Sequence, residues 1–519
     1  MKTSRLLLLS AALFTSCSLE PSLDKPGVEV VPVSFSGDGG GSASAALQWR
    51  SFFTDPRLKK LVGIALENNR DLRVAALNVE QSRAQYGISR SALFPSIDLS
   101  ATGSRRRTPG STATGGTAVE SRNFDVSVGL VSYELDLFGR VRSLNQAALG
   151  SYFASDAARV GTQIALVAEV ASQYFTERAL LEQIELSQQT LDSVSQTYDL
   201  TKTRLDAGDV SELDARSVEI QVQTAKANLA AYRQQLSVTR NALAFLIGTS
   251  LPASLPGGRS LEQGLVSDLR SGVPSDLLTR RPDILEAEHQ LRAANANIGA
   301  ARAAFFPRIT LTGGAGTASR SLGDLFQSGT SAWSFSPQVS VPIFDGGFNK
   351  ANLEVAEVRK QIGIAQYEKS IQTAFREVSD GLVSRTGIND QIVAYEGLVG
   401  AQQRRFDLAD TRYKQGVDSY FEVLDAHQDL YAARQVLIQL RLARLTNAVR
   451  LYKALGGGWE SRGTKNARWH ESHRAPSREV FTRPSASPGC CSGSHGNRDT
   501  PRALDRRAAS PWARPYRGR

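Results

Sequence analysis

The sequence contains an internal repeat, and this feature restricts the possible folds more than any other. Ten residues between Asp71 and Leu99 recur in the same order, without gaps, 212 positions later between Asp283 and Leu311. A second match, at an offset of 208, pairs Arg204 with Arg412, Gly208 with Gly416, and Ser211 with Ser419. Identities that keep their order over such spans indicate two copies of one structural unit. We therefore expect one repeat at residues 47–251, a second at 275–459, and a linker rich in Pro, Gly and Ser at 252–274.

Each repeat is expected to begin with a helix that a proline stops. The first helix starts at Asn69 and runs to Leu93, and Pro95 ends it because proline lacks an N–H group and disfavours helix at the residue before it. Pro307 occupies the same place in the second repeat. After each proline, apolar and polar residues alternate, which is typical of strands with two different faces. The apolar positions are Ile97, Leu99, Ala101, Phe124, Val126, Val128 and Leu130, and then Ile309, Leu311, Gly313, Ala315, Trp333, Phe335, Val339, Val341 and Ile343.

Two long helices are expected to follow the strands in each repeat. Their apolar residues recur every 3.5 residues on average, which indicates the seam of a coiled coil. Proline is absent from residues 140–250 and from 343–475. Each uninterrupted helix before its turn glycine, Gly208 or Gly416, covers about 65 residues, or about 100 Å at 1.5 Å per residue. Each repeat is therefore predicted to carry an antiparallel helical hairpin with its turn at that glycine.

The number of strands implies an assembly of several chains. Strands of about 10 residues have the length that crosses an outer membrane at a tilt. Four strands cannot close a membrane barrel, which needs about eight or more. An open sheet edge in lipid leaves backbone groups unpaired, at a cost of several kcal/mol each. We therefore expect several chains to pool their strands, with the long helices continuing the wall as a tube outside the membrane.

Several motifs resemble those of a known family. They are Asn68-Asn69-Arg70-Asp71-Leu72-Arg73, Leu93-Phe94-Pro95, Tyr133-Glu134-Leu135-Asp136-Leu137-Phe138-Gly139-Arg140, Arg280-Arg281-Pro282-Asp283-Ile284, Ala304-Phe305-Phe306-Pro307 and Tyr413-Lys414-Gln415-Gly416-Val417. Together they resemble the TolC-like outer-membrane efflux proteins, specifically the lipidated OprM/NodT-type branch. The resemblance extends from about Leu47 to Trp459. The tether departs from it, because Ser18-Leu19-Glu20-Pro21 stands where the branch carries Gly-Pro-Asp-Tyr.

The resemblance implies a mainly helical, TolC-like fold: a homotrimer in which four strands per chain form a 12-stranded outer-membrane β-barrel, continuous with a long α-helical barrel in the periplasm. It implies a passive exit duct for drugs or toxic small molecules. The partners it implies are a periplasmic adaptor (membrane fusion) protein and an inner-membrane resistance–nodulation–division pump. It implies neither catalysis nor a cofactor.

The same resemblance suggests a periplasmic gate near the Gly416 turn. The family carries an apolar residue at the position of Phe421 and a carboxylate at that of Asp425, and Glu422 lies on the same helix face. Tyr413 matches a tyrosine that tethers the closed state in TolC. Threefold symmetry would turn each residue into a ring about the channel axis. The alternative for Glu422 and Asp425 is an ordinary solvated helix face.

The N-terminus has the form of a lipoprotein export signal. Lys2 and Arg5 precede a run of nine apolar or small residues, 6–14, which is too short to span a bilayer. The run leads into Leu13-Phe14-Thr15-Ser16-Cys17, which resembles a lipoprotein cleavage site. We therefore expect a signal peptide at 1–16, lipidation at Cys17, an outer-membrane anchor and a tether at 17–46. An ordinary signal peptide with an incidental cysteine is the alternative.

The formal charge of +10 does not indicate a nucleic-acid partner. Residues 460–519 carry +8 of it and residues 1–16 carry +2, so the body between them is neutral. The residues from 460 on also lose all periodicity and are expected to form a basic, disordered tail, such as translation past the family's usual stop produces. An arm that binds anionic lipopolysaccharide or peptidoglycan is the alternative. Cys490 and Cys491 fit no zinc-ligand spacing, so no metal site is predicted.

Three functions remain open from the residues alone. An efflux duct is favoured by the lipoprotein signal and the motifs, while the outer-membrane duct of a type I protein secretion system would share the fold. A structural periplasmic coiled-coil lipoprotein is disfavoured by the alternating strands. An enzyme is not expected, because the body has no cysteine and only two histidines, His289 and His427, for a catalytic set.

Overall fold

The computed structural model describes residues 18–23, 48–112, 114–252, 254–267, 269 and 277–459. The signal peptide, Cys17, the tether beyond residue 23 and the tail from 460 on lie outside the described residues. The described residues fall within one compact unit by their contacts.

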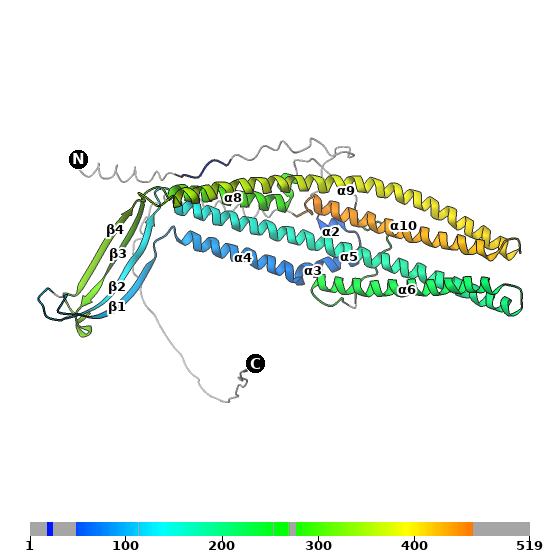
Figure 1. Ribbon diagram of the computed structural model, residues 1–519, viewed down its shortest axis with the longest axis horizontal. Coiled ribbons are helices and arrows are strands. Elements are labelled where there is room, and N and C mark those ends of the chain that lie inside the picture. Colours follow the sequence, from blue (N-terminus) through cyan, green and yellow to red (C-terminus); the bar gives the residue numbers. More distant parts are fainter. Residues whose placement is uncertain are drawn as a thin grey trace, which may run out of the picture. The chain divides into compact units, whose positions relative to one another are not determined.

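The elements follow one another twice in the same order, helix, strand, strand, helix, helix (Figure 1). A short pair of helices comes first: α2 (Trp49–Phe52) and α3 (Pro56–Asn68). The first repeat comprises α4 (Arg70–Ser91), β1 (Ile97–Thr108), β2 (Val119–Leu135), α5 (Arg140–Asp206) and α6 (Glu212–Ile247). After α7 (Leu277–Arg280), the second comprises α8 (Pro282–Ala303), β3 (Arg308–Ser319), the 3₁₀ turn η3 (Leu322–Asp324), β4 (Ser331–Ser340), α9 (Phe348–Lys414) and α10 (Tyr420–Ala454). This order confirms the predicted repeat of elements.

The first helix of each repeat ends shortly before a proline, and each long helix is followed by a glycine in the turn. Helix α4 ends at Ser91 and α8 at Ala303, each four residues before its proline, Pro95 or Pro307. Helices α5 and α9 each contain 67 residues, about 100 Å at 1.5 Å per residue. Gly208 and Gly416 follow them in the left-handed region, with φ of +85° and +74°, a conformation that glycine adopts without a steric cost.

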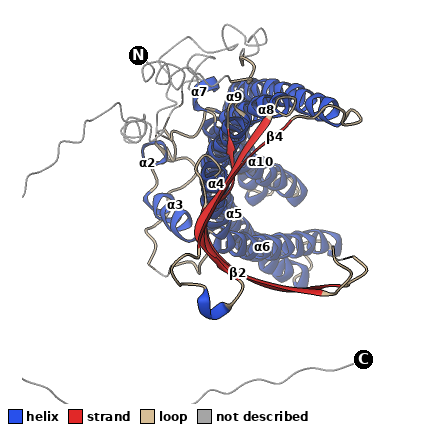
Figure 2. Ribbon diagram, turned by 90° about the vertical axis from the view of Figure 1, so that its left-hand side faces the viewer, coloured by secondary structure: helices blue, strands red, loops and turns tan. Residues whose placement is uncertain are grey.

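The strands form one antiparallel sheet in the order β1-β2-β3-β4. The prediction for the last strand was wrong at its end, since β4 stops at Ser340 and Val341 and Ile343 lie beyond it. Pro342 stands between those two residues and has no N–H group to extend the ladder. Figure 2 shows the sheet from its own end of the molecule, with β2 and β4 in front of the helices.

The helices pack mainly as neighbours within and between the repeats. Helix α5 contacts α4, α6, α8 and α10, while α9 contacts α8 and α10. Most predicted seam positions are buried or half-buried, including Tyr174, Leu243 and Val449. Phe421, a residue of the expected gate, has a side chain that is 65% exposed at the first turn of α10.

The segment predicted as a linker is packed into the core. Leu261, Leu265 and Leu269 are buried in the main hydrophobic cluster. The backbone at 265–267 pairs with α2 and the residues after it, through Thr54 N to Leu265 O at 3.0 Å and Ser267 N to Phe52 O at 2.8 Å. We call residues 254–267 the strap. It joins the repeats and also ties the N-terminal helices to the long helices.

Asp55 is the buried anchor of this strap. Its carboxylate accepts hydrogen bonds from Tyr174 Oη at 2.6 Å, from Arg57 N at 2.7 Å and from Arg259 N in the strap at 3.2 Å. Burial, with the Asp55 carboxylate beside it, raises the pKa of Tyr174, so the hydroxyl stays protonated and donates. A fully buried carboxylate needs such donors, because burying an unpaired charge is costly.

Candidate functional site: a two-faced sheet and two hairpin ends

The register of the sheet separates an apolar face from a polar one. One row across all four strands contains Leu99, Val128, Ala315 and Trp333, and the next contains Ile97, Leu130, Gly313 and Phe335. Residues one position away fall on the opposite face and are polar or small, such as Ser100, Ser127 and Gly316. The apolar face is uncovered in the single chain: Leu99 is 73% and Trp333 80% exposed. An exposed apolar surface beside a polar one is what a wall between lipid and water requires.

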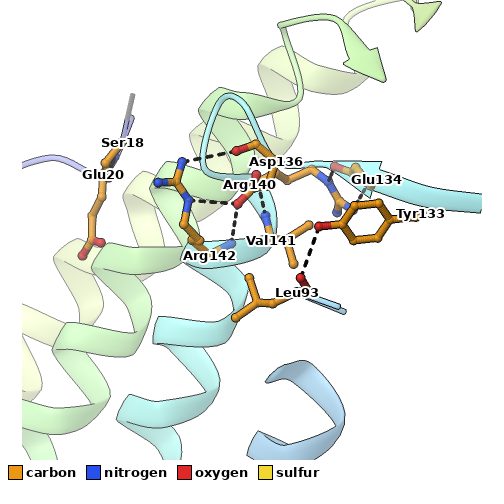
Figure 3. Close-up of polar contacts among 9 residues, drawn as sticks. All are labelled: Ser18, Glu20, Leu93, Tyr133, Glu134, Asp136, Arg140, Val141 and Arg142. Carbon is orange, nitrogen blue, oxygen red and sulfur yellow. Dashed lines mark hydrogen bonds and ion pairs between the residues drawn. The ribbon is translucent and has the colours of Figure 1, made fainter. Parts of the chain in front are cut away.

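Ion pairs hold the junction between β2 and α5, and Figure 3 shows those of Glu134 with Arg140 and of Asp136 with Arg142. Glu134 accepts from Arg140 Nε at 2.8 Å and Nη2 at 2.7 Å, and it also pairs with Arg308 at 2.8 Å. Asp136 accepts from the backbone N–H groups of Val141 and Arg142, at 3.2 and 2.9 Å. A carboxylate at the first N–H groups of a helix accepts from donors that have no partner within the helix, and its negative charge interacts favourably with the positive end of the helix dipole. The motif Tyr133–Arg140 thus sets the direction in which the long helix leaves the sheet.

The first described residues lie against α8 near this junction. Asn295 Nδ2 donates to Glu20 Oε1 at 3.1 Å and to Pro21 O at 2.9 Å. A side chain at Gly299 would meet the backbone of Glu20 at 3.1 Å, so the glycine permits this close approach. The residues that directly follow Cys17 are therefore held at the sheet end of the helices, as the position of Ser18 and Glu20 in Figure 3 shows.

The predicted gate residues lie on either side of the turn between α9 and α10, at the opposite ends of the long helices. Tyr413, near the end of α9, accepts a hydrogen bond from Arg204 Nη1 at 2.7 Å and meets the ring of Tyr420 edge-on at 5.2 Å. Arg204 lies near the end of α5, so this contact links the two hairpins across the repeat. Phe421 and Glu422 are exposed on α10.

Asp425 is paired within its own hairpin, which sequence reasoning missed. Arg405 on α9 donates through Nη2 to Asp425 and through Nη1 to Asp429 at 2.5 Å. The two carboxylates are four residues apart on α10 and face one guanidinium. Within one chain, the carboxylate of Asp425 therefore shares a basic partner, Arg405, with a further acid, Asp429.

The repeat explains why Arg204 is available to Tyr413. Its equivalent, Arg412, pairs with Asp418 in the adjacent turn, with Nη2 2.9 Å from Oδ1. The two turns read Gly208-Asp209-Val210 and Gly416-Val417-Asp418. Val210 thus replaces the acid that would hold Arg204, and its guanidinium extends to the other hairpin instead.

No group of three or more His, Cys, Asp or Glu side chains among the described residues is placed to hold a metal ion. Among those same residues, no helix is both long enough and apolar enough to cross a membrane.

The family model for outer membrane efflux proteins matches residues 61–249 and 273–457, which together make up more than half of the chain. The chain belongs to the outer membrane efflux protein family. The probable efflux pump outer membrane protein TtgC of Pseudomonas putida is 44% identical over 467 residues, covering 89% of this chain and 96% of that protein. The toluene efflux pump outer membrane protein TtgI of the same species is 46% identical over 468 residues, covering 88% and 99%.

A solved structure of an outer membrane channel has a similar fold. The open state of the Neisseria gonorrhoeae MtrE outer membrane channel has a TM-score of 0.80 at 42% identity, covering 85% of this chain and 98% of that one. The chain therefore has the fold of an outer-membrane efflux channel, and it acts as a channel component rather than as an enzyme.

Proposed function

We propose that three copies of this chain form the exit duct of a tripartite efflux pump in the outer membrane. The proposal of a trimer rests on the two open edges of the sheet. Among the described residues, β1 pairs only with β2, and β4 only with β3. Both edges must find partners in lipid, where unpaired backbone groups are costly. Pairing β4 of one chain with β1 of the next satisfies both edges, and three chains supply the 12 strands that the family resemblance implies.

The two faces of the sheet suit this arrangement. In a closed barrel, the apolar rows with Leu99 and Trp333 face lipid, and the polar rows with Ser100 and Ser127 face a water-filled lumen. The helices then extend the duct into the periplasm by about 100 Å. Their far ends are the proposed contact with an adaptor protein and, through it, with a proton-driven inner-membrane pump.

The conducted compounds are proposed to be small toxic organic molecules. TtgI is named as part of a toluene efflux pump, and ArpC of P. putida, 44% identical over 467 residues, as part of an antibiotic efflux pump. A passive duct needs no site of its own for these compounds. Selection by the pump is consistent with a wall that carries mainly Ser, Thr, Gly and Asp on its polar face.

The gate is proposed to lie at the hairpin ends. The Arg204–Tyr413 bond ties the two hairpins of one chain, and the Arg405 pairs tie α9 to α10. Phe421, Glu422 and Asp425 then approach the axis from each of three chains. Opening requires these ties to break so that the hairpins can move apart.

Lipidation of Cys17 is proposed as the second anchor, after a signal peptide at 1–16. The hydrogen bonds from Asn295 hold residues 20 and 21 beside α8, at the sheet end of the helices. A lipidated Cys17 would thus lie within a few residues of the membrane surface, where its acyl chains can insert. We further propose that the repeats at 47–251 and 275–459 act as one body, since Leu261 and Leu265 of the strap are buried in the main hydrophobic cluster, which includes residues of both repeats.

The test is efflux in cells that lack their own outer-membrane duct but express a matched adaptor and pump. The chain should lower the accumulation of a fluorescent pump substrate and restore resistance to it. A proton uncoupler should abolish both effects, because the duct supplies no energy. Accumulation that stays at the level of the duct-free cells, with the protein present in the outer membrane, would reject the proposal.

A further inference from the structure

The apolar face of the sheet ends in a cluster of arginines. Continuing along β1 beyond Leu99, the same face carries Ala101, Gly103, Arg105 and Arg107. The residues paired with the last two on β2 are Arg122 and Glu120. Arg106 lies between the two arginines on β1 but belongs to the opposite, polar face. The lipid-directed face therefore bears three arginines and one glutamate beyond its apolar rows.

The strand length places this cluster at a membrane boundary. The segment Ile97–Arg105 contains nine residues. A strand of roughly 9–11 residues crosses a bilayer at a tilt. Strand β1 (Ile97–Thr108) follows α4 directly, so Ile97 lies at the helix end of the strand and Arg105 near its other end. Figure 1 shows the strands extending away from the helices. Since the helices extend into the periplasm, the arginines lie at the outer leaflet.

The row before the arginines marks the edge of the apolar band. The ring of Phe124 lies against Gly103, where a Cβ atom would approach it at 3.1 Å. Aromatic side chains are common where a strand passes from hydrocarbon to the polar boundary. Arg122 is the next residue after Phe124 on the same face of β2. Phe124 would thus lie at the edge of the acyl chains, and Arg122 at the lipid headgroups.

The arginines are preorganised and exposed. Glu120 accepts from Arg105 Nε and pairs with Arg122 Nη2 at 3.3 Å. The side chains of Arg105 and Arg122 remain 65% and 53% exposed. One carboxylate holds two guanidinium groups near each other, and with Arg107 the cluster keeps a formal charge of +2. Guanidinium groups bind phosphate oxygens through two parallel hydrogen bonds, which makes arginine well suited to phosphate recognition.

We propose that Arg105, Arg107 and Arg122 bind the phosphate groups of a glycolipid in the outer leaflet, with its acyl chains against the apolar face. The proposal rests on the embedding of the sheet given under the proposed function. A membrane lipid fits better than a free ion, because the cluster is continuous with an apolar surface on the same face. Such a lipid would fix the depth of the sheet in the membrane.

The test titrates the purified full-length assembly, in phosphatidylethanolamine nanodiscs, with lipid A that carries two phosphates. Retained lipid A per assembly is counted by native mass spectrometry. The triple variant Arg105→Gln, Arg107→Gln, Arg122→Gln should weaken binding about tenfold or more, since charge-assisted bonds are among the strongest polar contacts. Arg106→Gln on the polar face is the matched control and should bind as the wild type does.

Two further arms need no variant. Lipid A without phosphates should bind the wild type about as weakly as phosphorylated lipid A binds the triple variant. Millimolar inorganic phosphate should leave bound lipid A in place. Equal binding by the triple variant, equal loss in Arg106→Gln, or full displacement by free phosphate would each overturn the proposal. Single-channel current of the wild type in bilayers free of lipid A tests the embedding separately: the account predicts a conducting channel, and an absence of current would reject the proposed function rather than the lipid site.

Discussion

The guanidinium of Arg204, near the end of α5, donates a hydrogen bond to the hydroxyl of Tyr413, near the end of α9, over 2.7 Å. The two residues come from different repeats and lie 209 positions apart in sequence. This polar contact links the hairpin ends of the two repeats within one chain. Its removal is the simplest way to test the gate.

Tyr413→Phe should favour the open state. The change removes the acceptor and keeps the ring, and the lost bond to a charged donor is worth about 1.5 kcal/mol or more per chain. Each 1.4 kcal/mol shifts an opening equilibrium about tenfold. Single-channel recording in planar bilayers should therefore show a higher open probability. Tyr198→Phe, on α5 in the small cluster with Val194, is the control. An open probability equal to that of the wild type would show that the Arg204–Tyr413 bond does not hold the closed state.

Arg405→Gln should increase cation selectivity. Arg405 faces both Asp425 and Asp429, so its removal leaves two carboxylates per chain without their shared cation. In a trimer the constriction becomes more negative by three charges, and acidic rings attract cations. Asp425→Asn should shift selectivity in the opposite direction. The measurement is the reversal potential in a salt gradient, with Arg404→Gln on the same helix as the control. Identical reversal potentials for all four proteins would show that these groups do not line the passage.

Stability should fall as the pH drops below about 6.5, and His427 should account for part of the loss. Burial, together with the charge of Arg434, lowers the pKa of His427, whose ring packs 5.2 Å from that of Phe406. Burial and Arg292 lower the pKa of His289 in the same way. A lowered folded-state pKa means that the unfolded chain binds the proton more tightly, so stability is complete above the ordinary pKa and declines below it.

The check is the Tm at pH 7.5 and at pH 5.5. His427→Gln should reduce the difference between the two values, and the double variant with His289→Gln should reduce it further. Each unit by which a pKa is lowered costs about 1.4 kcal/mol once both states can be protonated. A pH dependence unchanged in the double variant would mean that other groups cause it.

Asp55→Ala should destabilise the chain by about 3 kcal/mol, because a fully buried carboxylate with three donors is lost. Tyr174→Phe removes one of those donors and should cost about 1 kcal/mol. Thermal unfolding of the purified assembly measures both. Asp71→Ala, an exposed acid in the first turn of α4, is the control and should leave the Tm nearly unchanged. A Tm for Asp55→Ala equal to that of the control would show that the strap does not depend on Asp55.

The repeat and the two periodicities were enough to predict the order of elements, the hairpin turns and the length of the helices. Those features depend on residues close in sequence, such as a glycine after a helix or a proline before a strand. The strap was not predicted, because its Pro, Gly and Ser content is typical of a linker. The signal was the spacing by four of Leu261 and Leu265 in the strap and Leu269 beyond it, all of which are buried.

The ion pair between Asp425 and Arg405 was not predicted, for a different reason. Arg405 lies 20 residues before it, across a turn, so no local pattern joins them. In an antiparallel hairpin, residues at equal distances from the turn face each other, and Arg405 and Asp429 are each 12 positions from Val417. Counting outward from a predicted turn would have identified the pair. The exposure of Phe421, 65% at the first turn of α10, was likewise not predicted by the pattern of apolar residues.

The central claim is that three copies of this chain share one channel in the outer membrane. Native mass spectrometry of the full-length protein, released from lipid nanodiscs, tests it most directly because it counts the chains in each particle. The account predicts a dominant species with the mass of three chains, in which 12 strands leave no open sheet edge. A dominant monomer or dimer, with four or eight strands, would contradict it.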